Sequence, residues 1–389
     1  MNAQPSQRSH VDPFRVMQIL GQTDENSLVL CVGQPSSGAP TPVIRRVQQA
    51  LIDAPLGYTP TLGTDELRAT IADWHSAAYG VTTRPENVVI TTGSSGGFVA
   101  LFLAALDHGD TIAMSRPGYP AYRNTLQALG AQIVDLPCGP DTRFQPTARM
   151  LAELDTVPKA VIVTSPDNPS GTIIDPDELR AIAEWCDANG CLLISDEIYH
   201  GITYGRTCAT ARSYSGQAVV VGSLSKFFCM TGWRLGWLIV PDHLVEPLEN
   251  LQANLALCPP AVSQVGAVEA FTEESRRELA QRVEHYAAAR DVLLEKLPFT
   301  RFAPPDGGFY LYIYLYIDIS EYTDDSERWC RDLLRETGVA VAPGVDFDPI
   351  DGHRYIRISF CVDVDVIEQA CQRITEFCAS PLRCYRDRT

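Results

Sequence analysis

The chain has 389 residues, of which 45% are hydrophobic and 20% charged, a composition typical of an ordinary enzyme large enough for about two domains. Its 31 Lys and Arg residues against 48 Asp and Glu residues give a formal net charge of −17. Such acidity repels phosphate backbones and anionic lipid, which disfavours a general role on nucleic acid or at a membrane surface. A small anionic ligand remains compatible with it, because a few placed cations suffice to bind one.

Three further features favour a cytoplasmic protein. No apolar stretch approaches the roughly 18 residues of a membrane span. The first twelve residues contain no hydrophobic segment of the signal-peptide kind. The 12 cysteines are scattered and include no C-x-x-C pair, so we expect reduced, mostly buried thiols. No metal site is predicted.

From about residue 88 to residue 240, short β-branched runs alternate with helical patterns. The segment Pro176–Asn189, for example, has Leu179, Ile182, Ala183 and Cys186 on one face of a helix. Strands separated by helices predict an α/β fold with a mostly parallel sheet covered on both sides. The seven expected strands are Val88–Thr92, Thr111–Met114, Gln132–Leu136, Ala160–Thr164, Leu192–Asp196, Ala218–Ser223 and Leu235–Val240.

The pattern changes beyond about residue 260. One long helix is expected over Ser263–Leu297, followed by the alternating strand LYIYLYIDI and then helix, strand and helix. This indicates a second, smaller α+β domain. We predict an N-terminal arm at 1–45 that packs partly with the small domain, a large domain at 46–284 and a small C-terminal domain at 285–389.

Ligands of open parallel sheets bind beyond the carboxyl ends of the strands, and three of these ends carry unusual polar residues. The first strand runs into T-T-G-S-S-G-G at 91–97, where small residues and helix amides favour an anion such as phosphate. A tight strand-to-helix turn explains the same loop equally well. The run LLISDEIYH places Asp196 directly after a buried strand, either paired with a cation or as a helix cap or structural ion pair.

The third strand end is VVVGSLSKFFCMTGWRLGW, in which Lys226 lies among hydroxyl and aromatic residues. A lysine in apolar surroundings loses proton affinity and becomes nucleophilic, although a single lysine is usually a solvated surface charge. Together, a phosphate-type turn, a strand-end carboxylate and a lysine flanked by serine and arginine are the parts needed to hold pyridoxal phosphate. The T-T-G-S-S-G-G loop at 91–97 matches neither the P-loop nor the dinucleotide fingerprint, which disfavours nucleotide cofactors.

At these residues the chain resembles the class I/II aminotransferases, the fold-type I pyridoxal-phosphate enzymes, over nearly its whole length. The resemblance implies a large domain with a mostly parallel seven-stranded sheet between helices, a smaller α+β domain, and a homodimer with shared active sites. The motifs that carry it are V-G-Q-P at 32–35, G-Y-T-P-T-L-G at 57–63, T-T-G-S-S at 91–95, R-P-G-Y-P at 116–120, D-N-P-S-G-T at 167–172, S-D-E-I-Y at 195–199, S-L-S-K at 223–226, T-G-W-R-L-G-W at 231–237, P-D-G-G-F-Y at 305–310 and R-I-S-F at 357–360.

The resemblance implies catalytic roles for Lys226, Asp196 and Tyr199, and contacts with the cofactor ring for Asn168 and Tyr119. Lys226 would bond to the cofactor aldehyde and then move the substrate proton. Asp196 would pair with the pyridine nitrogen and keep it protonated, so that the ring acts as an electron sink. Tyr199 and Asn168 would hydrogen-bond the ring hydroxyl oxygen, and Tyr119 would stack on the ring.

Further residues would bind phosphate and substrate. The backbone amides of Ser94 and Ser95, the Ser223 hydroxyl and Arg234 would hold the cofactor phosphate, and Tyr58 would reach the phosphate of the neighbouring subunit. The substrate carboxylate would meet three residues: Arg357 as a bidentate fork, Gly33 and Asn168. The reaction implied is ping-pong amino transfer from an L-amino acid to a 2-oxo acid.

One rival function stays open and two others are disfavoured. A carbon–sulfur lyase of the same fold would share the lysine, the aspartate and the arginine. A nicotinamide dehydrogenase lacks its glycine fingerprint here. A regulator with a preceding DNA-binding domain is disfavoured because V-G-Q-P already begins at residue 32.

The substrate range is predicted from an absent cation. Relatives that use aspartate often carry lysine where this chain has Ser95, and an unpaired second carboxylate would be costly to bury. Tyr119, Phe309 and Tyr310 are expected near the cavity mouth. We therefore predict neutral donors (alanine, branched-chain or aromatic amino acids) over aspartate, with pyruvate or 2-oxoglutarate as acceptor. Arg15, or an arginine of a partner subunit, is the alternative source of a cation.

Overall fold

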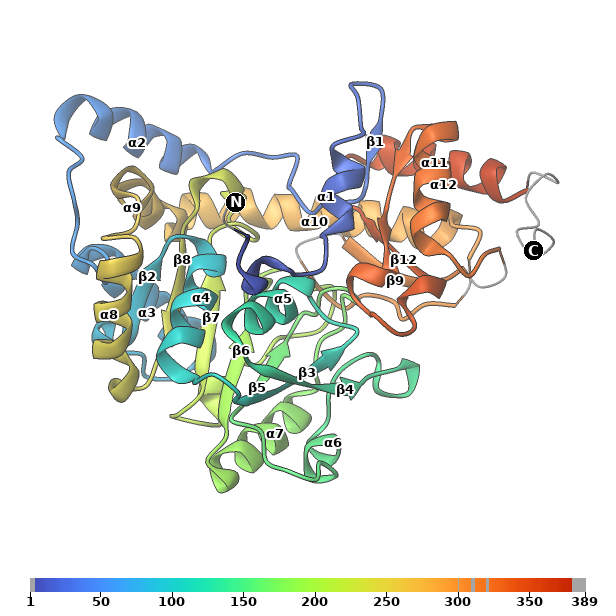
Figure 1. The fold of residues 1–389 in the computed structure, drawn as a ribbon. Coiled ribbons are helices and arrows are strands. Elements are labelled where there is room, and N and C mark those ends of the chain that lie inside the picture. Colours follow the sequence, from blue (N-terminus) through green and yellow to red (C-terminus); the bar gives the residue numbers. More distant parts are fainter. Residues whose placement is uncertain (1–3, 300, 309–311, 320–321, 380–389) are drawn as a thin grey trace.

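The computed structural model describes residues 4–299, 301–308, 312–319 and 322–379. Its central sheet contains β2 (Val88–Thr91), β3 (Thr111–Arg116), β4 (Gln132–Pro137), β5 (Ala160–Thr164), β6 (Leu192–Asp196), β7 (Val219–Ser223) and β8 (Gly236–Ile239). The strand order is β2-β8-β7-β6-β5-β3-β4 (Figure 1). Within this sheet β8 is antiparallel to both of its neighbours, β2 and β7, and the other strand pairs are parallel. The predicted seven-stranded, mostly parallel sheet is confirmed.

Strand direction brings the three predicted polar ends to one edge of the sheet. Because β8 is antiparallel to both β2 and β7, those two strands run the same way. Thr91 at the end of β2 and Ser223 at the end of β7 are both level with Gly236. On the next strand, Asp196 is paired with Val221. Side chains that follow β2, β6 and β7 can therefore share one site.

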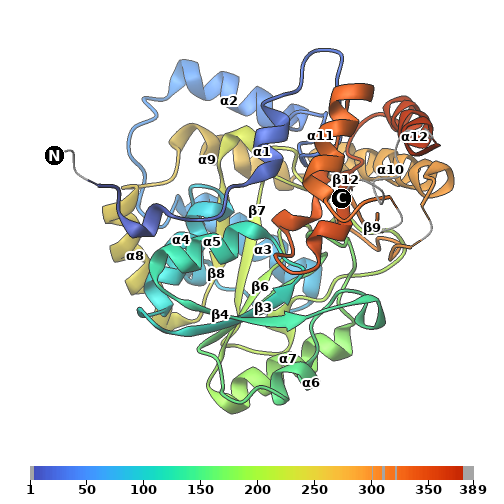
Figure 2. The same ribbon diagram turned by 45° about the vertical axis from the view of Figure 1, so that its right-hand side comes forward.

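Helices cover both faces of the sheet (Figure 2). On one face, α4 (Gly93–Ala105), α5 (Pro120–Leu129) and α8 (Asp242–Leu255) share an apolar core with residues such as Val89 and Ile194. On the other face, α6 (Ala148–Ala152) and α7 (Pro176–Asn189) pack against Val161 and Leu193, while α3 (Asp65–Tyr79) packs against β2.

The helix α7 matches its predicted bounds, because its sequence carries both end signals. The Asp175 side chain accepts a hydrogen bond from the Asp177 amide at 3.0 Å, and Pro176 occupies the first turn. Gly190 ends the helix in the left-handed conformation, with φ +64°. The four residues predicted on its apolar face are all buried.

The single helix expected over Ser263–Leu297 is wrong, because the chain breaks twice there. The segment forms α9 (Ala261–Ala267), the 3₁₀ turn η6 (Val268–Phe271) and α10 (Glu273–Lys296). Thr272 has extended backbone angles, and its hydroxyl accepts a hydrogen bond from the Ser275 amide. An N-cap within an apparently continuous pattern therefore starts a new helix.

The C-terminal part forms a smaller α+β layer. A three-stranded antiparallel sheet joins β11 (Ala342–Pro343), β12 (Tyr355–Ser359) and β9 (Tyr312–Asp318), with α11 (Ser326–Thr337) and α12 (Val364–Ala379) beside it. In Figure 1, α10 runs from the region of α9 toward this layer, where it packs on α12. The domain boundaries expected at residues 45 and 284 fall inside the helices α2 (Thr41–Asp53) and α10, and they remain predictions.

The N-terminal stretch lies against this layer and the large sheet. β1 (Leu28–Val29) pairs in parallel with β10 (Val339–Ala340), and α1 (Arg15–Leu20) contacts β11 and α11. α2 (Thr41–Asp53) instead packs on α9. The remaining 3₁₀ turns are η1 (Gln7–Ser9), η2 (Pro85–Asn87), η3 (Pro140–Thr142), η4 (Ala211–Ser213), η5 (Thr231–Trp233), η7 (Gly344–Asp346) and η8 (Gly352–Arg354).

Two further properties concern the chain as a whole. Among the described helices, none combines the length and the apolar character needed to cross a bilayer. The cysteines that the structure describes are free thiols, and most of them are buried.

Candidate active site

A cavity of about 550 Å³ opens at the carboxyl edge of the central sheet. Of the twelve residues predicted to form the site, the structure brings ten to its walls, and Ser223 and Tyr58 are the exceptions. The ten are Gly33, Ser94, Ser95, Tyr119, Asn168, Asp196, Tyr199, Lys226, Arg234 and Arg357. They come from the large sheet, from the N-terminal stretch and from β12, so the cavity lies between the two parts of the fold.

Lys226 follows β7 and reaches across the cavity toward the N-terminal stretch. Its Nζ donates a hydrogen bond to the carbonyl of Gly33 at 3.4 Å. Burial, together with the nearby charges of Arg357 and Arg234, lowers the pKa of Lys226 to about 7, while Cys361 and Asp196 act in the opposite direction. An amine with this pKa is partly neutral at physiological pH, as a nucleophile requires.

Asp196 ends β6 at the bottom of the cavity and is only 1% exposed. One carboxylate oxygen accepts a hydrogen bond from the Ile198 amide at 3.1 Å, and the other accepts one from the Tyr122 hydroxyl. Burial raises the pKa of Asp196 to about 6, although both hydrogen bonds and Lys226 act against the rise. Because burial destabilises the charged form of Asp196, a cation placed beside it in the cavity would stabilise the ionised carboxylate.

Tyr122 was missed in the sequence, although a signal was present. It stands three residues after Tyr119 at the start of α5, so both rings lie on one face of the helix. Their ring centroids are 5.2 Å apart in an edge-on arrangement.

The turn predicted to bind phosphate, at the start of α4, lies close to the side chain of Arg234. Gly93 begins α4 with φ +69°, and a Cβ there would lie 2.6 Å from Nη2 of Arg234. The glycine therefore lets the Arg234 guanidinium lie against the turn whose next residues are Ser94 and Ser95. The N-terminal amides of this 13-residue helix and the guanidinium together suit an anionic group.

Ser223 does not line the cavity. It is buried, and its hydroxyl accepts a hydrogen bond from the Ser225 amide at 3.1 Å. Ser225, two residues further along, lines the cavity in its place. Accepting this bond does not use the hydroxyl hydrogen, so the predicted contact of Ser223 with a phosphate stays a prediction.

Asn168 and Tyr199 are buried residues of the cavity wall. The Oδ1 atom of Asn168 is shielded from solvent and has no hydrogen-bond partner among the described residues. Such an atom is costly to bury unless a ligand completes its hydrogen bonds. With the partly uncompensated Asp196 and the anion cradle of Arg234, it shows that the cavity fits a ring carrying a hydroxyl, a basic nitrogen and a phosphate.

Arg357 enters the cavity from β12. It is buried, its Nη2 donates to the carbonyl of Cys31 at 2.5 Å, and its guanidinium carbon is 4.5 Å from the centroid of the Phe347 ring. These contacts hold a planar cation in place on the side of the cavity opposite the central sheet, where it can accept a carboxylate.

Tyr58 lies outside the cavity of its own chain. It is 86% exposed and borders a separate hollow with Leu56, Thr92 and Pro259. Its predicted contact with the phosphate of a neighbouring subunit stays a prediction.

The sequence did not reveal that the N-terminal stretch forms an apolar wall of the cavity, with Phe14, Val16, Met17, Leu20 and Val32. Among the described residues that line the cavity, the cationic side chains are those of Lys226, Arg234 and Arg357.

Arg15 faces away from the cavity. Its guanidinium pairs with Glu327 at 3.0 Å and with Asp346 at 3.4 Å. Phe309 and Tyr310, expected near the mouth, lie outside the described residues.

Comparison with known proteins gives the class first. The family model described as aminotransferase class I and II matches residues 25–374, and the chain belongs to this family. It is therefore an aminotransferase with the fold-type I architecture, of a family that generally uses pyridoxal phosphate.

Individual relatives cover almost the whole chain. The valine–pyruvate aminotransferase of Mycobacterium tuberculosis is 49% identical over 378 residues, which are 94% of this chain and 96% of the relative. A crystal structure of an aminotransferase from M. tuberculosis matches with a TM-score of 0.92 and 48% identity, covering 97% of this chain and 99% of that one. The aspartate aminotransferase of Thermus thermophilus with maleate matches with a TM-score of 0.90 and 27% identity, covering 96% and 100%.

Proposed function

We propose that this enzyme binds pyridoxal phosphate and transfers the amino group of a neutral, aliphatic L-amino acid to pyruvate or a similar 2-oxo acid. The observation that carries the proposal is the pairing of an apolar wall, formed by residues such as Val16, Met17 and Leu20, with three cations in one cavity. Arg234 would bind the cofactor phosphate, Arg357 the substrate α-carboxylate, and Lys226 would carry out the proton transfer. None of the three is left for a second substrate carboxylate. The name of the M. tuberculosis relative supports the same pair of substrates.

The side chains divide the work as follows. Arg234 and the first amides of α4 would hold the cofactor phosphate, and Asp196 would hold the ring nitrogen in its protonated form. Bound pyridoxal phosphate supplies an electron sink for the electrons released at the substrate α-carbon. Arg357 would bind the substrate carboxylate and so orient the α-hydrogen. Lys226 Nζ would accept that proton and return it, as its lowered pKa allows.

A homodimer in the cytoplasm is part of the proposal. Exposed apolar side chains occur on α2 and on two loops that border one hollow, among them Leu51, Ile52, Tyr58 and Leu257. An apolar surface of this kind is a candidate interface between subunits.

The proposal is tested by the products of one reaction. Purified enzyme with valine, pyruvate and added cofactor is expected to form alanine and 3-methyl-2-oxobutanoate in equal amounts, with no ammonia released. A sulfur-containing amino acid converted to pyruvate and ammonia without any acceptor would instead identify a carbon–sulfur lyase.

A further inference from the structure

The segment 303–308, between α10 and β9, lies against two loops of the large sheet. The amides of Asp306 and Gly307 donate to the carbonyl of Gly171 at 2.9 and 3.1 Å. On the other side, the Tyr204 amide donates to the carbonyl of Asp306 at 2.7 Å, and the Gly308 amide donates to that of Ile202 at 3.0 Å. The segment therefore connects the loop after β5 with the loop after β6. These are the loops that carry Asn168 and Tyr199.

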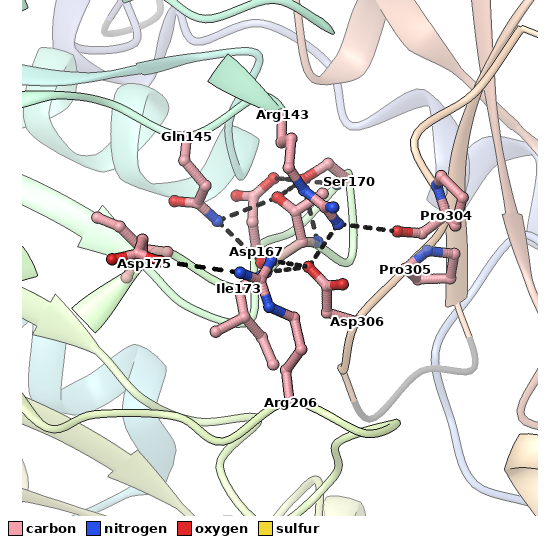
Figure 3. A network of polar contacts seen from close by, with 12 residues as sticks. Arg143, Gln145, Asp167, Ser170, Ile173, Asp175, Arg206, Pro304, Pro305 and Asp306 are labelled. Carbon is pink, nitrogen blue, oxygen red and sulfur yellow. Dashed lines mark hydrogen bonds and ion pairs between the residues drawn. The ribbon is translucent and has the colours of Figure 1, made fainter. Parts of the chain in front are cut away.

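The carboxylate of Asp306 is the centre of this connection (Figure 3). Its Oδ2 accepts hydrogen bonds from the Ile173 amide at 3.1 Å, from Arg143 Nη2 at 2.6 Å and from Arg206 Nη1 at 3.3 Å. Arg143 also donates to the carbonyl of Pro304 at 3.3 Å. The Asp306 side chain is only 12% exposed. Its removal would leave the Ile173 amide without this acceptor and would take one partner from each guanidinium, leaving Arg143 with the carbonyl of Pro304 and Arg206 with the carboxylate of Asp175 at 3.8 Å.

The Asn168 turn is closed immediately beside these contacts. The Gly171 amide donates to the carbonyl of Asp167 at 2.9 Å, and the Asp167 amide donates to that of Thr172 at 2.9 Å. Asn168 lies inside this closed turn. Asp306 therefore bonds to both sides of the turn's exit, through the carbonyl of Gly171 and the amide of Ile173.

The two segments are also in direct steric contact. A Cβ at Gly171, whose φ is +71°, would lie 2.6 Å from Cβ of Pro305. A Cβ at Gly307 would lie 2.6 Å from the carbonyl oxygen of Ile202. With glycine at both positions the backbones meet without a spacer, so a shift of the segment 303–308 must be transmitted to both loops.

We infer that Asp306, held by Arg143 and Arg206, is a positioning residue that keeps Asn168 and Tyr199 aimed at one ring oxygen of the bound cofactor. The inference rests on the proposed function. Asp306 acts from outside the cavity, by fixing the backbone of the two loops. Its loss would let both donors drift from the ring oxygen without removing either of them.

The test replaces Asp306 by Asn, which keeps the shape and removes the charge. The first measurement is the affinity of the cofactor-free variant for pyridoxal phosphate, which is expected to fall about tenfold. The second is the pH midpoint of the visible absorbance of the bound cofactor, which is expected to rise. Donors that stabilise the ionised ring oxygen favour the deprotonated cofactor, so weaker donors shift its titration to higher pH.

Three comparisons make the result decisive. Glu368→Gln breaks the pair that Lys296 forms with Glu368 at 2.6 Å, away from the cavity, and should leave both readouts unchanged. Arg143→Gln removes one ion-pair partner of Asp306 at a more exposed position. It should lower the affinity for pyridoxal phosphate and raise the pH midpoint, as Asp306→Asn does. In the Asn168→Ala background, Asp306→Asn should have a smaller effect than in the wild type, because one of the two residues it positions is already gone.

The outcomes separate this inference from the proposed function. A wild-type protein that binds no pyridoxal phosphate would overturn the proposed function itself. A wild type that binds it, beside an Asp306→Asn or Arg143→Gln variant with lower thermal stability but unchanged affinity and midpoint, would show that the cluster is only structural and would overturn the positioning role.

Discussion

The hydroxyl of Tyr122 donates a hydrogen bond to the carboxylate of Asp196, and both side chains are buried. Burial, together with the neighbouring charge of Asp196, raises the pKa of Tyr122 well above its ordinary value, so the phenol keeps its proton and remains a donor. The same hydrogen bond lowers the pKa of Asp196, against the rise caused by burial. Tyr122 therefore helps to keep Asp196 charged, which is the state that would hold a protonated ring nitrogen.

Replacing Tyr122 by Phe tests this relationship. Without the donor, the pKa of Asp196 should rise further above about 6, and kcat should fall about tenfold. Asp196→Asn removes the charge altogether and should lower kcat by at least about a hundredfold, with a much smaller loss of cofactor occupancy. Tyr286→Phe is the matched control, since this tyrosine is equally buried but lies outside the cavity lining. Wild-type kcat in both Tyr122→Phe and Asp196→Asn would make Asp196 a helix cap or a structural group.

The pKa of Lys226 predicts how the enzyme without cofactor captures pyridoxal phosphate. A lysine attacks an aldehyde only as the neutral amine, and burial lowers the pKa of Lys226 to about 7. Below that pH the protonated form dominates, so the capture rate should rise as the pH increases through about 7 and then level off. An ordinary lysine would give a rate that still rises near pH 10. Stopped-flow absorbance of the cofactor between pH 5.5 and 9.5 measures the profile.

Three lysines allow a clean control for that experiment. Lys226→Ala should abolish the cofactor linkage that borohydride reduces and lower turnover by several powers of ten, while the fold survives because no charge is added to the interior. Lys159 and Lys296 are the other lysines of the chain, and their Ala variants should retain both properties. If borohydride still reduced a cofactor linkage in Lys226→Ala, Lys226 would not be the lysine that bonds to the cofactor.

Much of this site could be predicted because its main residues follow strands. Asp196 ends a buried apolar strand and Lys226 follows the end of another by three residues, and parallel strands present their carboxyl ends at one edge. Tyr122, the apolar wall and the Asp306 cluster could not be predicted in the same way. Their contacts join segments more than seventy residues apart, such as Tyr122 with Asp196 or Arg143 with Asp306. No local periodicity encodes such a contact.

The wrong prediction of one long helix has a similar origin. Thr272 interrupts the predicted helix over Ser263–Leu297 with a cap that local apolar periodicity conceals. The phosphate contact assigned to Ser223 by its place in S-L-S-K stays a prediction, because its hydroxyl accepts a hydrogen bond from the Ser225 amide and can still donate one.

A shared active site predicts that two inactive subunits can repair each other. Tyr58 is exposed in its own chain and would act in the cavity of the partner. Mixing Lys226→Ala with Tyr58→Phe should restore activity in hybrid dimers, because the site that keeps Lys226 receives Tyr58 from the other subunit. Lys226→Ala mixed with Asp196→Asn is the control, since both residues belong to the same chain's site and neither hybrid site is intact. Equal activity in the two mixtures, under conditions shown to exchange subunits, would contradict the shared site.

The substrate range follows from the charges and the apolar wall of the cavity. Arg15, the cation of this chain that could have served a second carboxylate, is bound to Asp346 and Glu327 instead. A carboxylate brought against Val16, Met17 and Leu20 would be desolvated without a partner, at a cost of several kcal/mol. We therefore expect kcat/KM with pyruvate as acceptor to be higher for valine than for aspartate by a factor of about a hundred or more. Ser95→Lys should narrow this ratio by placing a cation at the cavity wall, whereas Ser95→Met, with an uncharged chain of similar length, should not. A wild-type enzyme that prefers aspartate tenfold would show that a cation from the partner subunit reaches the cavity, and would overturn the assignment of neutral donors.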